Sequence, residues 1–128
     1  MIIGTGIDLV EIHRMKKAVE NPLFVQRVFT SPEQAYCNSR GRQGAASYAA
    51  RFAAKEAVMK ALGTGLAGGG TWQDVEVLPD DQGKPVMKLT GHFAQLAESL
   101  GVAQIFVSLS HAQEYAVAQV LLGRDEKE

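Results

Sequence analysis

The amino-acid sequence predicts an α+β fold, in which a small, mainly antiparallel sheet packs against one long helix. Three observations lead to this prediction. Residues 45–62 form one long helical pattern, which a glycine closes. Strand-like segments rich in β-branched and apolar residues occur at the start of the chain and, in pairs separated by short turns, in its second half. The chain has 128 residues with no repeats and no internal linker, so residues 1–128 are predicted to form a single domain.

The first half of the chain is predicted to contain one strand and four helical segments. Residues 2–9 are apolar and β-branched between glycines, which favours a strand. The helical segments are 11–20, with apolar residues at 12, 15 and 19; 23–29, after Pro22 ends or redirects the first helix; a third segment from residue 31; and 45–62, after a loop at 41–44. Ser31 is the predicted N-cap of the third segment, with Pro32 as its first residue and Gln34 as the capping-box partner. Gly63 is predicted to end the long helix in the left-handed conformation.

The second half is predicted to contain two pairs of strands and one helix. The glycine-rich residues 63–70 form a mobile connection. The elements that follow are a strand at 71–79, a hairpin turn at 80–85, a strand at 86–90, a helix at 91–101, and two strands at 105–111 and 115–122. Trp72, Val75 and Val77 supply the apolar side of the first of these strands. The charged residues 123–128 are predicted to fray.

Composition and charge narrow the range of functions. The formal net charge is −1, so the chain lacks the positive field that nucleic-acid-binding proteins use. No apolar run approaches the roughly 20 residues of a membrane-spanning helix, and the first ten residues lack the pattern of a signal peptide. Cys37 is the only cysteine and is interpreted as a small packing residue. These features favour a cytoplasmic protein that binds neither nucleic acid nor membranes.

The segment RFAAKEAVMKALGTG, residues 51–65, carries charges at unusual positions. On a helix, Glu56 and Lys60 lie one turn apart among alanines, while Lys55 points into the apolar side. A purely structural explanation is available for Glu56 and Lys60, because a glutamate four residues before a lysine stabilises an exposed helix by roughly 0.2–0.5 kcal/mol. Lys55 can also bury its methylene groups while its ammonium stays in water. Taken alone, the helix favours this explanation.

Asp8 shifts the balance toward a metal and phosphate site. It interrupts an apolar strand, where an uncompensated carboxylate is costly to bury. Asp8 and Glu56 together can supply the two carboxylates that often hold Mg²⁺, and Lys60 can then balance charge on a phosphoryl group. Several residues can also contact phosphate, through the backbone at Gly63 and Gly65 and through the side chains of Ser108, Ser110 and His111. Each of these features also has an ordinary structural explanation.

Four segments in this order are more specific than any single residue: GTGIDLVEI, RFAAKEAVMKALGTG, TWQDVEVLPDDQGKP and VSLSHAQEYAVAQV. Together they resemble the bacterial holo-[acyl-carrier-protein] synthases, the small group within the 4′-phosphopantetheinyl transferases, over essentially the full chain. The resemblance implies the fold of that family and transfer of the phosphopantetheine arm of coenzyme A to a serine of apo acyl carrier protein, with release of adenosine 3′,5′-bisphosphate. The pathway it implies is fatty acid biosynthesis.

The resemblance also implies roles for individual residues. Asp8 and Glu56 match the Mg²⁺ ligands of the family, and Lys60 matches a lysine near the transferring phosphate. The residues that it associates with coenzyme A are Arg51, Lys55, Lys60, Gly63, Gly65, Ser110 and His111. The base that takes the serine proton is either a water on the metal or Glu56, and the sequence leaves this choice open.

One departure from the larger, single-chain members of the superfamily concerns the metal. Those proteins carry an acidic residue two positions after the first aspartate, where this chain has Val10. The resemblance therefore implies that a water fills this position, since Glu11 points to the opposite side of a strand. In those members a Ser-His segment lies before the aspartate, whereas here Ser110 and His111 come near the end. This order suits a homotrimer in which one subunit supplies Asp8 and Glu56 and its neighbour supplies His111.

Basic residues after the Asp8 strand are candidates for binding the acidic carrier protein. Arg14 matches a docking position of the family, and Arg27 follows from the next segment. Such charges mainly set the rate and orientation of encounter. Lys16 and Lys17 could equally lie on a solvated helix face without contacting the carrier. Met15 could add an apolar contact to the carrier or, equally, pack in the core.

Two other functional classes remain open from the sequence. One is a non-catalytic module that binds coenzyme A or an acidic partner, although Asp8 and Glu56 would repel phosphate unless a metal lay between. The other is a small oligomeric scaffold whose helix charges are only surface pairs, which leaves Asp8 unexplained.

Overall fold

The computed structural model describes residues 1–126 and confirms the α+β prediction. The strands are β1 (Ile2–Glu11), β2 (Val75–Pro79), β3 (Pro85–Leu89), β4 (Gln104–His111) and β5 (Tyr115–Gly123). The helices are α1 (Ile12–Ala18), α2 (Pro22–Val28), α3 (Ser31–Asn38), α4 (Gly44–Leu62) and α5 (Gly91–Ser99), and three 3₁₀ turns are η1 (Gly41–Gln43), η2 (Leu66–Gly68) and η3 (Trp72–Asp74). The strands form two antiparallel sheets, one in the order β1-β5-β4 and one made by β2 and β3.

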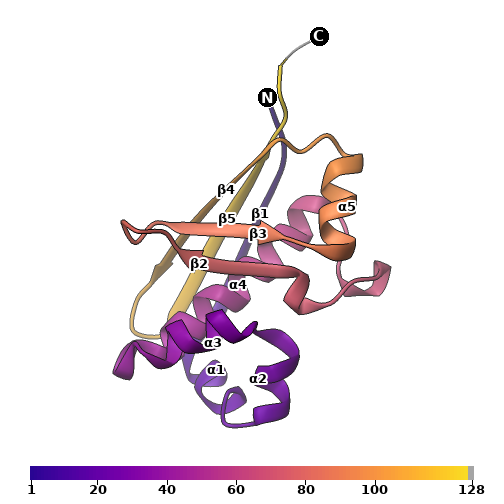
Figure 1. Cartoon of the computed structure of the whole chain (residues 1–128). Helices are drawn as coiled ribbons and strands as arrows, with labels where there is room; N and C mark the ends of the chain where they lie inside the picture. Colours follow the sequence, from indigo (N-terminus) through magenta and orange to yellow (C-terminus); the bar gives the residue numbers. More distant parts are fainter. Residues whose placement is uncertain (127–128) are drawn as a thin grey trace.

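The long helix α4 is the centre of the molecule. It runs between the three-stranded sheet and the β2–β3 hairpin, with α1, α2 and α3 gathered at one end (Figure 1). The main core lies around α4 and contains Ala53, Ala57, Val58, Val77 and Val120. Gly63 ends α4 with a φ of 88°, as the sequence predicts.

β1 lies unusually close to α4 because its inward side carries glycines. A Cβ atom at Gly6 would lie 1.9 Å from the carbonyl oxygen of Ala57, and one at Gly4 would lie 2.6 Å from that of Ala61. Since side chains alternate along a strand, Asp8 is the next residue on the inward side. The glycines thus bring a carboxylate against the helix that carries Glu56 and Lys60.

The outward face of the three-stranded sheet is exposed and apolar. Ile7, Leu9, Phe106 and Tyr115 have exposed fractions of 59%, 60%, 53% and 41%. No element among residues 1–126 covers these side chains. An exposed apolar area of this kind marks an interaction surface more often than a monomer surface.

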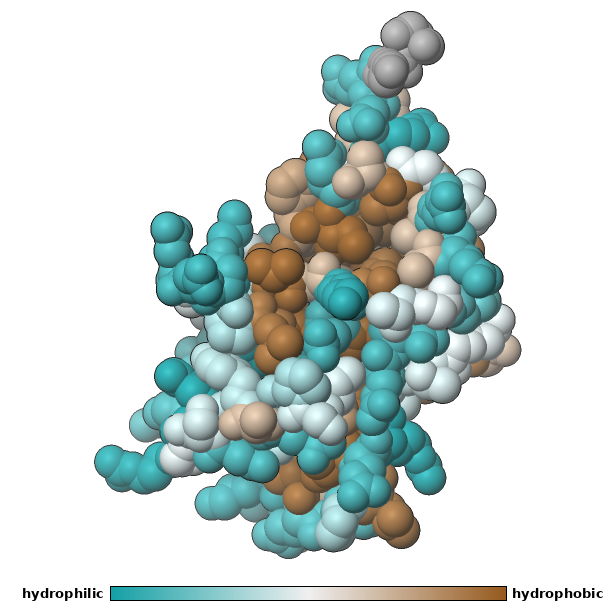
Figure 2. Space-filling model, viewed as in Figure 1, coloured by the Kyte–Doolittle hydropathy of each residue, from teal (hydrophilic) through white to brown (hydrophobic). Residues whose placement is uncertain are grey.

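Another apolar region lies on the face that carries the hairpin. A groove of about 500 Å³ between α5, β3 and β4 is lined by Leu89, Val102 and Ile105. Figure 2 shows apolar surface gathered over this part of the molecule.

In the described part of the chain, no helix is both long and apolar enough to span a membrane.

Several predicted boundaries were wrong. The N-cap of α3 is Thr30 and not Ser31, because Glu33 and Thr30 form the reciprocal capping box, and Gln34 instead donates to the carbonyl of Phe29 at 2.9 Å. Of the two roles predicted for Pro22, the structure shows the second: α1 already ends at Ala18, and Pro22 opens α2, which Asn21 caps.

The predicted strand at 71–79 is shorter than expected. Trp72 lies in η3, where Thr71 and Asp74 form a capping box, and β2 begins only at Val75. The predicted fraying at 123–128 is wrong at its start, since Gly123 ends β5 and the N–H of Arg124 donates to the carbonyl of Met1 at 2.8 Å. Residues 127–128 lie outside the described residues.

Candidate active site

α4 carries its charged residues on two separate faces. Glu56 and Lys60 lie one turn apart on the side of β1, where Lys60 is exposed and Glu56 is half-buried. Arg51 and Lys55 lie one turn apart on the side of α3, and both are buried. The charged residues of this one segment therefore lie in two environments, one beside β1 and one beside α3.

Asp8 finds its counter-ion in Lys60. The Lys60 Nζ atom lies 2.9 Å from Asp8 Oδ1 and donates a second hydrogen bond, of 3.0 Å, to the carbonyl oxygen of Ile7. The Asp8 side chain is 18% exposed and that of Lys60 54%. The cation that a carboxylate in an apolar strand requires is thus supplied by the helix opposite.

Glu56 has an unusual proton affinity. Burial raises the pKa of its carboxyl group, the negative charge of Asp8 raises the pKa further, and Lys60 partly offsets both effects. A carboxyl group whose pKa is raised by a neighbouring carboxylate is in an arrangement that a shared cation stabilises. Asp8 and Glu56 line the same groove, so the structure brings together the two residues that the sequence pairs.

Two grooves meet at Glu56. The first, the Glu56 groove, has a volume of about 540 Å³ and is lined by Asp8, Val10, Arg14, Met15, Phe24, Phe52 and Glu56, among others. The second, the glycine groove, has a volume of about 350 Å³ and is lined by Glu56, Met59, Lys60, Gly63, Thr64 and Gly65. Two ligands approaching along these grooves would therefore meet beside Glu56, Asp8 and Lys60.

The donor atoms for a metal are the two carboxylates. Among the described residues, no group of three or more His, Cys, Asp or Glu side chains gathers around one point. Val10 brings no carboxylate to the Glu56 groove; Glu11 also lines this groove, but it is exposed and its Oε1 atom lies 3.8 Å from the Nε atom of Arg14. Two hard oxygen donors beside open space fit Mg²⁺, which keeps waters and phosphate oxygens as its other ligands.

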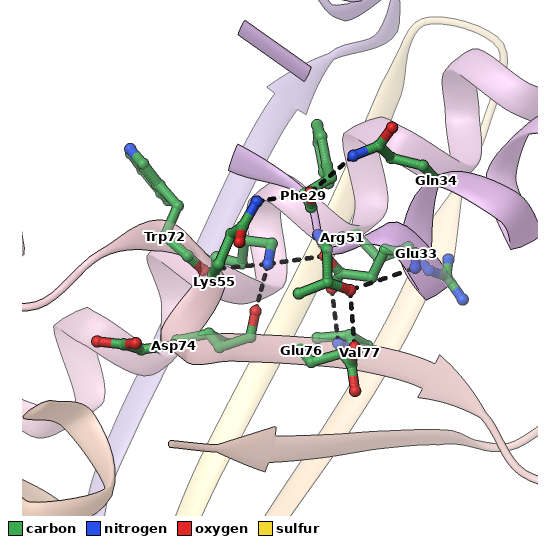
Figure 3. A network of polar contacts seen from close by, with 12 residues as sticks. Phe29, Glu33, Gln34, Arg51, Lys55, Trp72, Asp74, Glu76 and Val77 are labelled. Carbon is green, nitrogen blue, oxygen red and sulfur yellow. Dashed lines mark hydrogen bonds and ion pairs between the residues drawn. The ribbon is translucent and has the colours of Figure 1, made fainter. Parts of the chain in front are cut away.

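Lys55 points into the apolar side of α4, as the helical pattern predicts, but its position does not support the contact with coenzyme A that the resemblance implies. It has no exposed surface, and its Nζ atom lies 2.9 Å from Glu33 Oε1 and donates to the carbonyls of Trp72 and Val75 (Figure 3). The expectation that its ammonium stays in water is wrong, because Glu33 and two carbonyls replace the water. In this structure Lys55 presents no surface to coenzyme A.

Arg51 is also buried, with 5% of its surface exposed. Its guanidinium carbon lies 4.6 Å from the centre of the Tyr36 ring on α3, and its Nη1 atom donates to the carbonyl of Ser47 at 3.4 Å. Contact with coenzyme A is therefore not supported by the position of this side chain.

Ser110 and His111 lie apart from Asp8 and Glu56 within one chain. Ser110 is exposed on the outward face of β4. His111 lines a separate groove of about 440 Å³ with Arg42, Gln43 and Ala46, near the start of α4. Ten residues of α4 separate Ala46 from Glu56, which is about 15 Å along a helix. The same chain thus does not bring His111 to the carboxylates.

The two candidate docking residues are both exposed. Arg14 lines the Glu56 groove, and Arg27 lies in the last turn of α2. Lys16 and Lys17 are exposed on α1, whereas Met15 is 4% exposed and belongs to the core.

The sequence did not reveal an aromatic wall made by Phe24, Phe52 and Trp72. The rings of Phe52 and Trp72 stack at 4.9 Å, and those of Phe24 and Phe52 lie 6.3 Å apart. Phe24 and Phe52 line the Glu56 groove. Phe52 comes four residues before Glu56, which is one helical turn, and this spacing is the one sequence signal that connects it to the site.

Comparisons with known proteins find matches over nearly the whole chain. A model of the 4′-phosphopantetheinyl transferase superfamily matches residues 4–120. A holo-[acyl-carrier-protein] synthase of Geobacter sulfurreducens is 51% identical over 126 residues, which cover 97% of this chain and 99% of the relative. Another, from Koribacter versatilis, is 46% identical and covers 95% and 98%. A crystal structure of a holo-(acyl-carrier-protein) synthase from Bacillus anthracis in complex with CoA (3′,5′-ADP) has a TM-score of 0.81 at 36% identity and covers 98% and 99% of the two chains.

Proposed function

This chain belongs to the 4′-phosphopantetheinyl transferase superfamily, and on that premise we propose that it transfers 4′-phosphopantetheine from coenzyme A to a serine of an apo acyl carrier protein. The serine oxygen forms a bond to the β-phosphorus of coenzyme A, the pyrophosphate bond breaks, and adenosine 3′,5′-bisphosphate leaves. The products are the holo carrier protein and this nucleotide. We assign the reaction to one transferase domain, residues 1–128, in fatty acid biosynthesis and in the cytoplasm.

The pairing of Asp8 and Glu56 where the two grooves meet carries the proposal. It gives each substrate its own approach: coenzyme A along the glycine groove, where Gly63 and Gly65 leave the backbone accessible, and the carrier along the Glu56 groove. Arg14 at the edge of the Glu56 groove offers a positive charge to the acidic carrier protein, and Arg27 adds another from α2.

Asp8 and Glu56 would hold Mg²⁺, whose chemistry is to offset the charge that develops on the transferring phosphate and the leaving group. Lys60 is already within hydrogen-bonding distance of Asp8 and can reach a phosphate at the same place. The base that takes the serine proton is either a water on the metal or the Glu56 carboxylate itself. Substitution of Asp8, Glu56 and Lys60 tests these roles.

We further propose a homotrimer whose active sites lie between subunits. Two observations support it: the outward face of the three-stranded sheet exposes Ile7, Leu9 and Phe106, and His111 shares a groove with Ala46, which lies about 15 Å along α4 from Glu56. A neighbouring subunit packed on the sheet would cover the apolar face and could bring His111 to the carboxylates.

Mass spectrometry tests the reaction directly. The protein is incubated with apo acyl carrier protein, coenzyme A and Mg²⁺, and the carrier is weighed with and without a chelator. A mass gain equal to phosphopantetheine, lost with the chelator, is expected. No gain from a folded protein that binds coenzyme A would instead favour a non-catalytic binding module.

A further inference from the structure

Lys55 and Glu33 form an ion pair with no exposed surface on either side chain. The Lys55 ammonium has three acceptors, and both oxygens of the Glu33 carboxylate have a donor. The Lys55 ammonium donates to Glu33 Oε1, to the Trp72 carbonyl at 3.2 Å and to the Val75 carbonyl. The Glu33 carboxylate also accepts from the N–H groups of Thr30 at 2.9 Å and Val77 at 2.7 Å (Figure 3).

Stability alone does not account for this pair. Removing two charges from water costs about as much as their attraction returns, and apolar side chains of similar volume often replace a buried pair without loss. The pair instead holds neighbouring elements of the fold together. Its hydrogen bonds join α3, η3 and β2 to α4 at the residue next to Glu56.

One of these connections leads to the Glu56 groove. Lys55 holds the backbone of Trp72, and the ring of Trp72 stacks on Phe52 at 4.9 Å with an interplanar angle of 28°. Phe52 lines the Glu56 groove, and it lies one helical turn before Glu56. The path from the buried ammonium to the groove surface therefore passes through two residues.

We propose that Lys55 is a positioning residue, whose buried pair with Glu33 fixes Trp72 and through it the aromatic wall along which the carrier protein approaches Glu56. Lys55 itself touches neither substrate. The substrate side of this inference rests on the proposed function, whereas the link from Lys55 to Trp72 does not.

Two variants separate positioning from a purely structural role. Lys55→Met keeps most of the side-chain volume but leaves Glu33 as an uncompensated buried carboxylate, so it lowers stability. Adding Glu33→Gln removes that charge and restores part of the stability. In both variants the Trp72 carbonyl has lost its donor. A positioning role predicts that the double variant recovers thermal stability but not the wall.

Trp72 reports on the wall directly, because it is the only tryptophan in the chain. In the folded double variant, we expect Trp72 emission at longer wavelength and stronger quenching by acrylamide than in the parent protein. In the transfer assay, we expect a KM for the carrier protein about tenfold higher, with the KM for coenzyme A within about twofold of the parent. The matched control is Lys88→Met, at an exposed position on β3, which should change neither signal.

Three results would overturn the inference. One is unchanged Trp72 emission and quenching in the folded double variant. Another is a carrier KM that returns to the parent value together with the stability, which would make the pair purely structural. A third is a rise in the KM for coenzyme A alone, which would mean direct contact. Since fluorescence needs no turnover, a parent protein that transfers nothing would reject the proposed function without deciding the link to Trp72.

Discussion

Lys60 Nζ lies 2.9 Å from Asp8 Oδ1, so an ammonium group is already paired with one of the two carboxylates assigned to the metal. A divalent cation that uses this oxygen must displace Lys60 or share the oxygen with it. When another cation takes over Asp8, Lys60 has an additional donor for a phosphate. The side chain thus links metal binding to phosphate binding through one shared atom.

The first prediction follows from this competition. Lys60→Met should raise the affinity for Mn²⁺ several-fold, up to about tenfold, because a competing positive charge is removed. The same change should lower transfer activity, since the phosphate loses a cation. Paramagnetic resonance of free Mn²⁺ during a titration measures the affinity, with Lys88→Met as the control for loss of one surface charge. Weaker Mn²⁺ binding in Lys60→Met would contradict the competition.

The second prediction concerns the two carboxylates. Asp8→Asn and Glu56→Gln should each lower transfer by at least about a hundredfold, as the removal of a charge-stabilising group does elsewhere. The fold should persist, and Glu56→Gln should slightly raise the melting temperature of the metal-free protein, because a partly buried charge beside Asp8 is removed. Circular dichroism and the transfer assay check both points, with the exposed Asp81→Asn as the control. Retention of activity in both variants would remove the basis of the metal site.

The raised pKa of Glu56 gives the third prediction. The folded protein holds this proton more tightly than the unfolded chain does, because of burial and then Asp8. The group therefore contributes stability that is fully present below the ordinary glutamate pKa and is lost as pH rises through the raised value. In that window, the melting temperature of the metal-free protein should fall with pH more in the parent than in Glu56→Gln. Mn²⁺ affinity should show the opposite trend, strengthening as Glu56 ionises, and identical pH curves for the two proteins would contradict the assignment.

The fourth prediction tests the contact that brings Asp8 to α4. Gly6→Ala would place a Cβ atom 1.9 Å from the carbonyl oxygen of Ala57, so β1 must move away from the helix. We expect a loss of about 3 kcal/mol in the free energy of unfolding, at the upper end for an overpacked core, and weaker Mn²⁺ binding. The control for stability is Gly65→Ala, because a Cβ there meets nothing within 4 Å and the φ of −102° suits alanine. Urea denaturation of both variants gives the comparison, and equal stability would show that β1 tolerates the shift.

Local patterns in the sequence predicted the long helix, its end at Gly63 and the hairpin, because these depend on neighbouring residues. The same patterns failed where a distant residue decides. The capping signal at Thr30 and Glu33 is present in the sequence, but the role of Glu33 as the partner of Lys55 depends on residues 22 positions apart meeting in the core. The unusual placement of Lys55 was visible; its counter-ion was not.

The site shows the same division. Asp8 could be recognised as a carboxylate that needs a cation, because its strand is apolar. That the cation is Lys60 depends on Gly4 and Gly6 allowing β1 to approach α4, which is a tertiary contact. The order of the segments, compared with the larger family members, already implied that His111 and Glu56 come from different subunits; the register of β4 and β5 shows how one chain keeps them apart.

The last prediction concerns Cys37, which has no exposed surface. Burial raises the pKa of its thiol from the ordinary 9.0 to about 12, with a small increase from Glu33, against the opposing effects of Arg51 and Lys55. Because only the thiolate reacts with iodoacetamide, the native protein should stay unmodified at pH 8.5 while the urea-unfolded chain is alkylated completely, as mass spectrometry can measure. Rapid alkylation of the native protein would mean that α3 and α4 open readily, which would also weaken the case for a rigid pair between Lys55 and Glu33.

The same raised pKa makes stability depend on pH. The stability that the neutral Cys37 thiol contributes is fully present below pH 9.0 and is lost as pH rises toward 12. The melting temperature should therefore fall more steeply over that range in the parent than in Cys37→Ala, and equal slopes would contradict the shift.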